Sequence, residues 1–263
     1  MTTGVSQSRT IGHAETVMGT VVSFVVHTGA LSDAEVHSAL ARACRTLHDA
    51  DNTFSTWKPQ SPVSRLRRGE ATLEELPTEV ATVLGLCERA KAASRGWFDP
   101  WAMPGGVDPT GLVKGWAAEQ ALAELVQPGV PAAMVNAGGD LAVHDRPAPA
   151  EAWRVGIRHP WRIDALACVI EADAAVATSG AYERGEHLID PHTGRPLTKA
   201  ASATVTGPSL AIADALATAL VIAGAGEIGL VTALAGYDAY VIGLDGSELA
   251  SDGIRFTPLH DLC

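Results

Sequence analysis

The stretch Leu210-Ala-Ile-Ala-Asp214-Ala-Leu-Ala-Thr218-Ala-Leu-Val-Ile-Ala223 predicts a helix that is apolar on every side except at Asp214 and Thr218. A helix without a polar face is expected in the core. Its two polar side chains are four residues apart and share one face, about 5–6 Å apart at Cβ. A buried carboxylate is costly unless it is paired or bound to a cation, and two oxygen ligands one turn apart suit magnesium. An alternative stays open: Thr218 bonds back to the carbonyl of Asp214, whose carboxylate accepts from a backbone N–H or pairs with an arginine.

The composition around this helix supports a folded protein and disfavours polyanionic partners. The 263 residues are 47% hydrophobic and 19% charged, far from the composition of disordered chains. Lysine and arginine number 19 against 30 acidic residues, a net charge of −11. Because such a chain repels phosphates, we expect neither nucleic acid nor a membrane surface as a partner.

Cysteine spacing and apolar run lengths predict a soluble, cytoplasmic protein. Cys44, Cys87, Cys168 and Cys263 form no CxxC pair, so they are expected to be thiols of a cytosolic chain. The first fifteen residues lack the apolar core of a secretion signal. No apolar run approaches the roughly 20 residues that span a bilayer.

Periodicity along the chain places helices early and strands later, which favours an α+β fold. Ser32-Asp33-Ala34-Glu35 has capping-box spacing at a helix start. No repeat or linker divides the chain, so one domain over 1–263 is expected. Helices are expected from residue 32 and at 78–93, 115–125, 209–223 and near 227–235; strands at 17–27, 133–143, 153–158, 167–170, 175–179, 203–206 and 240–242; and a polar loop at 51–68.

Eight short motifs lie in order along the chain. They are Met18-Gly19-Thr20; Phe54-Ser55-Thr56-Trp57 with Ser64-Arg65-Leu66; Trp97-Phe98-Asp99-Pro100; Asp108-Pro109-Thr110-Gly111-Leu112-Val113-Lys114-Gly115; Asn136-Ala137-Gly138-Gly139-Asp140; Ala177-Thr178-Ser179-Gly180; His187-Leu188-Ile189-Asp190-Pro191-His192-Thr193-Gly194; and Ala213-Asp214-Ala215-Leu216-Ala217-Thr218-Ala219. Each motif alone is weak, but together and in register they resemble the ApbE-type FAD:protein FMN transferases, which depend on magnesium.

The resemblance implies a single-domain α+β fold, with a core at about 17–243, in which a mixed or antiparallel sheet and packed helices form an FAD cleft. It implies that FAD is cleaved at its pyrophosphate, that FMN is esterified to a Thr or Ser of a target protein, and that AMP leaves. Two alternatives are a magnesium-dependent FAD pyrophosphatase that yields FMN and AMP, and a flavin-binding protein without turnover.

By the same resemblance, Asp214, Thr218 and the backbone carbonyl of Gly111 are magnesium ligands, and Asp108 and Lys114 contact FAD. Asp108 before a proline is also typical of a helix cap. Lys114 could equally be a solvated helix residue.

His187 is the candidate catalytic base, because an imidazole titrates near neutrality and a hydroxyl is a poor nucleophile without a base. An isolated loop histidine is otherwise a surface residue. Asp190 in the following turn is expected to hold the loop in shape, and His192 is expected to be structural.

The remaining matches fall where the family contacts the flavin and the rest of FAD. Aromatic faces among them can stack on a flat ring, although Trp and Phe are more often core residues. The Asn136–Asp140 segment resembles a phosphate-cradling loop, or else marks close backbone packing at a strand bend. These matches are Met18, Trp57, Trp97, Phe98, Asp99 and Leu188.

Overall fold

A computed structural model describes residues 9–126, 130–145, 152–180 and 188–258. Eight of the described strands form one sheet in the order β1-β2-β3-β4-β7-β10-β11-β12, and each neighbouring pair is antiparallel. The strands are β1 (Thr10–Val17), β2 (Thr20–His27), β3 (Ala132–Ala137), β4 (Asp140–His144), β7 (Ala175–Gly180), β10 (Ala200–Gly207), β11 (Asp238–Gly243) and β12 (Glu248–Ala250).

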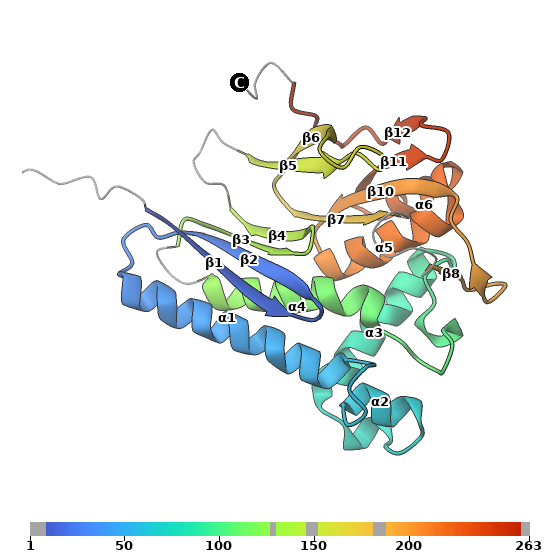
Figure 1. Ribbon diagram of the computed structural model, residues 1–263, viewed down its shortest axis with the longest axis horizontal. Coiled ribbons are helices and arrows are strands. Elements are labelled where there is room, and N and C mark those ends of the chain that lie inside the picture. The colour runs from blue at the N-terminus through green and yellow to red at the C-terminus, as the bar shows by residue number, and fades with distance from the viewer. Residues whose placement is uncertain (1–8, 127–129, 146–151, 181–187, 259–263) are drawn as a thin grey trace, which may run out of the picture.

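Helices pack on one face of this sheet and enclose the larger core (Figure 1). The helix α5 is buried at every described position except Thr218, as an all-apolar sequence requires. The helices are α1 (Asp33–Phe54), α2 (Pro62–Arg67), α3 (Thr78–Ala93), α4 (Thr110–Leu125), α5 (Leu210–Ala223) and α6 (Gly229–Thr232), with short 3₁₀ turns at Leu73–Glu75, Pro100–Ala102 and Ala225–Glu227.

The other face is covered by a two-stranded ribbon, β5 (Trp153–Arg158) and β6 (Leu166–Ala172), as Figure 1 shows. Trp153 and Ile170 from the ribbon pack with Tyr240 of β11 in a second apolar cluster. A short hairpin, β8 (Ile189–Asp190) and β9 (Arg195–Pro196), stands apart from both sheets. The expected α+β fold class is therefore confirmed, with an antiparallel sheet between a helical layer and a ribbon.

The start of α1 follows the predicted capping box. The Ser32 backbone N–H donates to Glu35 Oε2 at 2.9 Å, and the Glu35 N–H donates to Ser32 Oγ at 3.4 Å. Two free N–H groups at the helix start are thereby satisfied.

Several element boundaries differ from the sequence predictions. The strand β1 was not predicted, because its residues are mostly exposed on both faces and lack a strand-like apolar alternation. The expected strand at 133–143 is a hairpin, β3 and β4, that turns at Gly138 and Gly139, both with positive φ. The expected loop at 51–68 contains the end of α1 and all of α2, which Ser61 caps by accepting from the Ser64 N–H. The helix α4 begins at Thr110, five residues earlier than predicted.

The helices α4 and α5 approach closely at Gly115. A Cβ added there would lie 2.7 Å from the carbonyl oxygen of Leu210. Near the same crossing, the Glu119 carboxylate of α4 accepts from the backbone N–H of Leu210 at the start of α5. Burial raises the pKa of Glu119, and its hydrogen bonds from Leu210 and Ser209 act against that rise. The two helices can therefore pack closely because Gly115 has no side chain. The Glu119 carboxylate of α4 also caps the start of α5.

Within the described ranges, no helix is both long enough and apolar enough to cross a membrane.

The α4–α5 crossing predicts that Gly115→Ala destabilises the fold. The added methyl group meets rigid backbone, so the free energy of unfolding should fall by about 1–3 kcal/mol, measured by urea denaturation. Gly85→Ala is the matched control, because Gly85 is an exposed residue within α3 whose added Cβ meets nothing within 4 Å. Helix propensity should stabilise that variant by up to about 1 kcal/mol. Equal effects of the two substitutions would contradict the close crossing.

Candidate active site

Two cavities meet beside the first turns of α4. The first, about 290 Å³, opens between α4, α5 and the segment 97–108. The second, about 460 Å³, lies between the β1–β2 turn and the end of α1. Thr110 and Lys114 line both cavities, so the two are adjacent and are treated together as one elongated site.

Eleven of the twelve predicted site residues line this elongated site. His187, the predicted base, lies outside the described residues, whereas Leu188, the next residue in the chain, lines the first cavity. The first cavity is lined by Trp97, Phe98, Asp99, Asp108, Gly111, Lys114, Leu188, Asp214 and Thr218, and the second by Met18, Trp57 and Lys114.

The two polar residues of α5 face the first cavity. The Asp214 side chain is only 7% exposed. The Thr218 hydroxyl lies 3.1 Å from the Ser179 hydroxyl on β7. The side chain of Thr218 is thus directed across to the sheet, and both α5 residues line the same cavity.

The charged side chain of Lys114 on α4 links this helix to β4 and α5 through ion pairs. Its Nζ forms an ion pair with Asp140 Oδ2 at the start of β4 and lies 3.5 Å from Asp214 Oδ2 on α5. The Lys114 side chain is 25% exposed, so it reaches from the cavity into the protein. Of the two sequence interpretations, a solvated helix residue does not describe Lys114, because it pairs with two buried carboxylates.

Asp140 is a site residue to which sequence reasoning assigned no role. Its side chain is 1% exposed, and its Oδ1 accepts from the Thr178 backbone N–H at 2.9 Å. The Asn136–Asp140 segment is the turn between β3 and β4, where the Gly139 N–H donates to Asn136 Oδ1 at 2.7 Å. A carboxylate directly after two glycines was the available signal, but its partner Lys114 is distant in sequence.

Gly138 in that turn allows a close backbone approach at the cavity wall. Its φ is +64°, and an added Cβ would lie 2.5 Å from Thr20 Oγ1. Both conditions require glycine. The strand-bend interpretation of this segment therefore holds, and Gly138 also lines the first cavity.

Asp108 lies in the turn just before α4, whose N-cap position is Pro109 and not Asp108 as the sequence suggested. Its Oδ1 accepts from the Thr110 backbone N–H at 3.0 Å, at the start of α4. Its Oδ2 pairs with Arg67 Nη1 at 3.0 Å, and Arg67 also donates to the carbonyl of Pro104 at 2.9 Å. Arg67 thus fixes the cavity wall, and the sequence prediction did not include it.

Phe98, Gly111 and Asp99 shape the same wall. A Cβ on Gly111 would lie 3.1 Å from Phe98 Cε2, so the ring packs directly on the backbone of α4. Asp99 accepts from the Trp101 N–H at 3.0 Å and pairs with Lys91 at 2.9 Å. Asp99 therefore has a structural task whether or not it contacts a ligand.

The second cavity presents Met18 and Trp57. Met18 occupies the turn between β1 and β2 with φ +53°, an unusual conformation for a residue other than glycine. Such strained residues cluster at functional sites. Trp57 is 93% exposed, which rules out the alternative that it is a core residue. An exposed indole beside a cavity can stack on a flat ring.

Trp97 and the turn after Leu188 close the first cavity. The ring of His192 contacts Trp97 edge-on, with centroids 4.7 Å apart, and Lys199 Nζ lies 4.8 Å from the Trp97 ring centre. Asp190 accepts from the His192 N–H and the Thr193 hydroxyl, each at 2.9 Å. Burial raises the pKa of Asp190, but these hydrogen bonds together with the charges of His192 and Lys199 outweigh burial, and the pKa is lowered. The structure thus gives Asp190 and His192 the structural roles expected for them.

The fold and site define an α+β protein whose oxygen-lined cleft lies where two helices meet a sheet. A model of the ApbE family matches residues 18–106 and 102–241. The chain therefore belongs to the ApbE family, and the resemblance seen in the sequence is confirmed.

Curated relatives share moderate identity with part of the chain. The FAD:protein FMN transferase of Rhodobacter capsulatus is 35% identical over 163 residues, which are 57% of this chain and 30% of that protein. The FAD:protein FMN transferase of Vibrio cholerae is 35% identical over 130 residues, 45% of this chain and 39% of that one. The matched part thus spans well under half the length of these relatives.

Solved structures share the fold. The flavin transferase ApbE from Vibrio cholerae aligns with a TM-score of 0.80 at 22% identity, covering 93% of this chain and 98% of that one. The ApbE protein from Thermotoga maritima aligns with a TM-score of 0.79 at 21% identity, covering 93% and 97%.

The Asp140 contacts predict a graded effect of substitution on stability. Asp140→Ala should lower the free energy of unfolding by about 1–3 kcal/mol more than Asp140→Asn, because Asn keeps an acceptor for the Thr178 N–H and Ala leaves that donor unpaired. Chemical denaturation measures both. Asp49→Asn on the exposed face of α1 is the control and should stay within about 0.5 kcal/mol of the unsubstituted protein. Equal losses for Ala and Asn at Asp140 would contradict this assignment.

Proposed function

We propose that this chain transfers FMN from FAD to a Thr or Ser hydroxyl of another protein and releases AMP, with the help of magnesium. The observation that carries the proposal is the elongated site, in which both cavities share a charged residue and each contains an aromatic side chain. Lys114 is shared by the two cavities, Trp57 lies in one and Phe98 in the other. A dinucleotide has the matching form, with a pyrophosphate between two flat rings.

The donor atoms of the first cavity fit a magnesium ion. Asp214, Thr218 and the Gly111 carbonyl would offer oxygen only, which Mg²⁺ prefers, usually together with water and substrate phosphates. All three residues line this one cavity, which supports the fit. When bound there, Mg²⁺ would neutralise pyrophosphate charge and act as a Lewis acid.

The residues of the chain would divide the remaining tasks. His187 takes the proton of the acceptor hydroxyl, whose oxygen then attacks the phosphorus on the riboflavin side of FAD. The bond from that phosphorus to the bridging oxygen breaks, and AMP leaves with the electron pair. Lys114, which lines both cavities, would pair with the pyrophosphate and the departing phosphate. The exposed face of Trp57 and the Met18 side chain would hold one ring system.

The names of the curated relatives support the same activity. Both relatives compared above are FAD:protein FMN transferases. Since they match over part of their length, the acceptor protein and the full reaction belong to the proposal.

Incubation with FAD, Mg²⁺ and a flavin-accepting protein domain tests the proposal. We expect the acceptor to gain the mass of one FMN and AMP to appear in equal amount, followed by mass spectrometry and chromatography. His187→Ala should slow transfer by about 10²–10⁴-fold while FAD binding is kept. His37→Ala, on the exposed face of α1, is the matched control and should transfer normally.

Other results would select a different function. Free FMN and AMP with an unchanged acceptor would indicate a pyrophosphatase. Stable FAD binding without AMP would indicate a flavin-binding protein. Undiminished transfer by His187→Ala would refute its role as base.

The oxygen ligands predict a metal requirement that follows the α5 side chains. Thr218→Val removes one oxygen at nearly constant shape, so half-maximal activity should need at least about 10–100-fold more Mg²⁺, the cost known even for outer-shell partners. Asp214→Asn should have a larger effect because it removes a charge. Thr218→Ser is the control, since it keeps the hydroxyl. AMP release is titrated with Mg²⁺ for each variant. An unchanged Mg²⁺ requirement in Asp214→Asn would show that Asp214 is not a metal ligand.

A further inference from the structure

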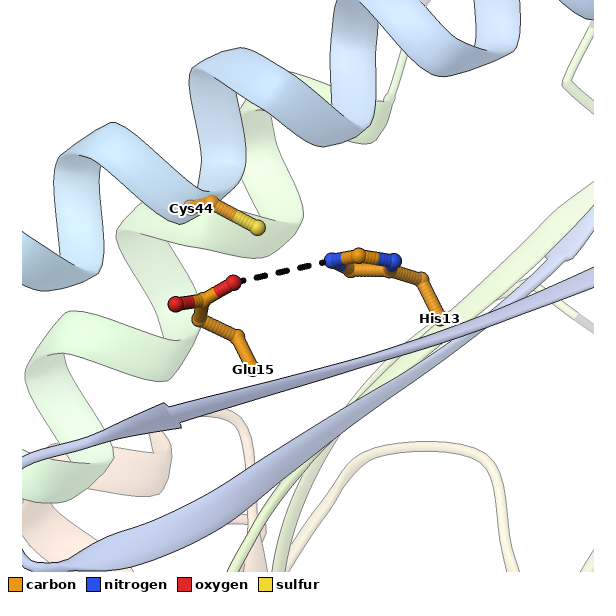
Figure 2. Close-up of side chains that lie close together, drawn as sticks. All are labelled: His13, Glu15 and Cys44. Carbon is orange, nitrogen blue, oxygen red and sulfur yellow. Dashed lines mark ion pairs between the residues drawn. The ribbon is translucent and has the colours of Figure 1, made fainter.

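A second group of chemically reactive side chains lies outside the elongated site, between β1 and α1. His13 and Glu15 are two residues apart on β1 and therefore point to the same face of the strand. Cys44 and His48 are four residues apart on α1 and share one helix face. Figure 2 shows the His13 ring, the Glu15 carboxylate and the Cys44 thiol directed toward one another.

The distances are those of ligands around a common centre. One donor atom each from His13, Glu15 and Cys44 lies within 4.8 Å of the others. His13 Nε2 lies 3.7 Å from Glu15 Oε2. Ligand atoms around a tetrahedral zinc ion are about 3.3–3.6 Å apart, given bond lengths near 2.0–2.3 Å. Small side-chain rotations would therefore close the group on an ion.

The donor types select the class of metal. Imidazole nitrogen and thiolate sulfur suit zinc and related transition metals, whereas magnesium and calcium prefer oxygen. The His13 and Glu15 side chains are 41% and 29% exposed, so an ion and a completing water can reach them from solvent. Cys44 is a free, half-buried cysteine.

We propose that His13, Glu15 and Cys44 bind a zinc ion, with water as the fourth ligand. His48 is a positioning residue for this site. Its Nε2 lies 2.9 Å from Glu15 Oε1, the oxygen opposite to the one that faces His13. An outer hydrogen bond of this kind fixes the orientation of a ligating carboxylate.

The ion would link β1 to α1. In the described sheet, β1 is an edge strand that pairs with β2 alone. Two ligands come from β1 and one from α1, so zinc would tie the sheet edge to the helix that covers it. This inference does not depend on flavin transfer.

Cobalt and zinc titrations of the whole protein test the site. Chelator-treated protein is kept reduced without added thiols and titrated with Co²⁺ in excess Mg²⁺, which occupies oxygen-only sites. We expect one Co²⁺ per chain with a thiolate-to-cobalt charge-transfer band in the near ultraviolet, and loss of that band when Zn²⁺ displaces Co²⁺. His48→Ala should weaken Zn²⁺ binding by about 10–100-fold.

Matched variants separate this site from adventitious binding. Cys44→Ser and His13→Gln should abolish the band, with folding confirmed by circular dichroism. Cys168→Ser and His37→Gln, which change the same residue types elsewhere, should keep it. Absence of the band in the unsubstituted protein, or equal Zn²⁺ affinity in Cys44→Ser and the unsubstituted protein, would overturn the proposal. Since His13 is exposed on an edge strand, its variant tests the site even if Cys44→Ser does not fold.

Discussion

The pairing of the Lys114 ammonium group with the carboxylates of Asp140 and Asp214 constrains how α4, β4 and α5 are arranged at the centre of the molecule. Both carboxylates are almost fully buried, at 1% and 7% exposure, and buried charges are tolerated only when they are compensated. Because both carboxylates pair with Lys114, α4, β4 and α5 meet at one point. Gly115, the next residue, permits that meeting because a side chain there would strike the backbone of α5. The close packing of α4 on α5 is thus also what brings Lys114 to its two carboxylates.

This arrangement also resolves how an acidic chain could accept an anionic ligand. The net charge of −11 describes the whole surface, whereas a ligand in the cleft meets the local field. Among the described residues, Lys114 pairs with two buried carboxylates. A divalent cation would add positive charge beside them and make the cleft more attractive to phosphate. Carboxylates that repel an anion by themselves would therefore support its binding by holding a cation.

The sequence predicted those parts of the fold and site that depend on local patterns. The burial of α5, the capping box at Ser32 and the α+β class follow from spacing and polarity within one element, and ordered motifs placed most of the cleft lining. The misses depend on contacts distant along the chain. Asp140 and Arg67 acquire their roles through Lys114 and Asp108, and no local pattern indicates such pairs. The strand β1 was missed because most of its residues are exposed and its apolar residues do not alternate.

The zinc group was missed for a related reason. Sequence spacing finds metal sites whose ligands are close in the chain, such as CxxC pairs, whereas His13 and Cys44 come from different elements. Their position bears on Met18, which follows β1 directly and is held with φ +53° beside the second cavity. A strained residue persists only when its surroundings determine its conformation. The pairing of Val17 with Thr20 supplies one such restraint, and an ion that fixed β1 to α1 would supply a second. The zinc ion would then stabilise the second cavity at Met18 from outside the cleft. Lys114 stabilises the centre of the cleft through its own ion pairs.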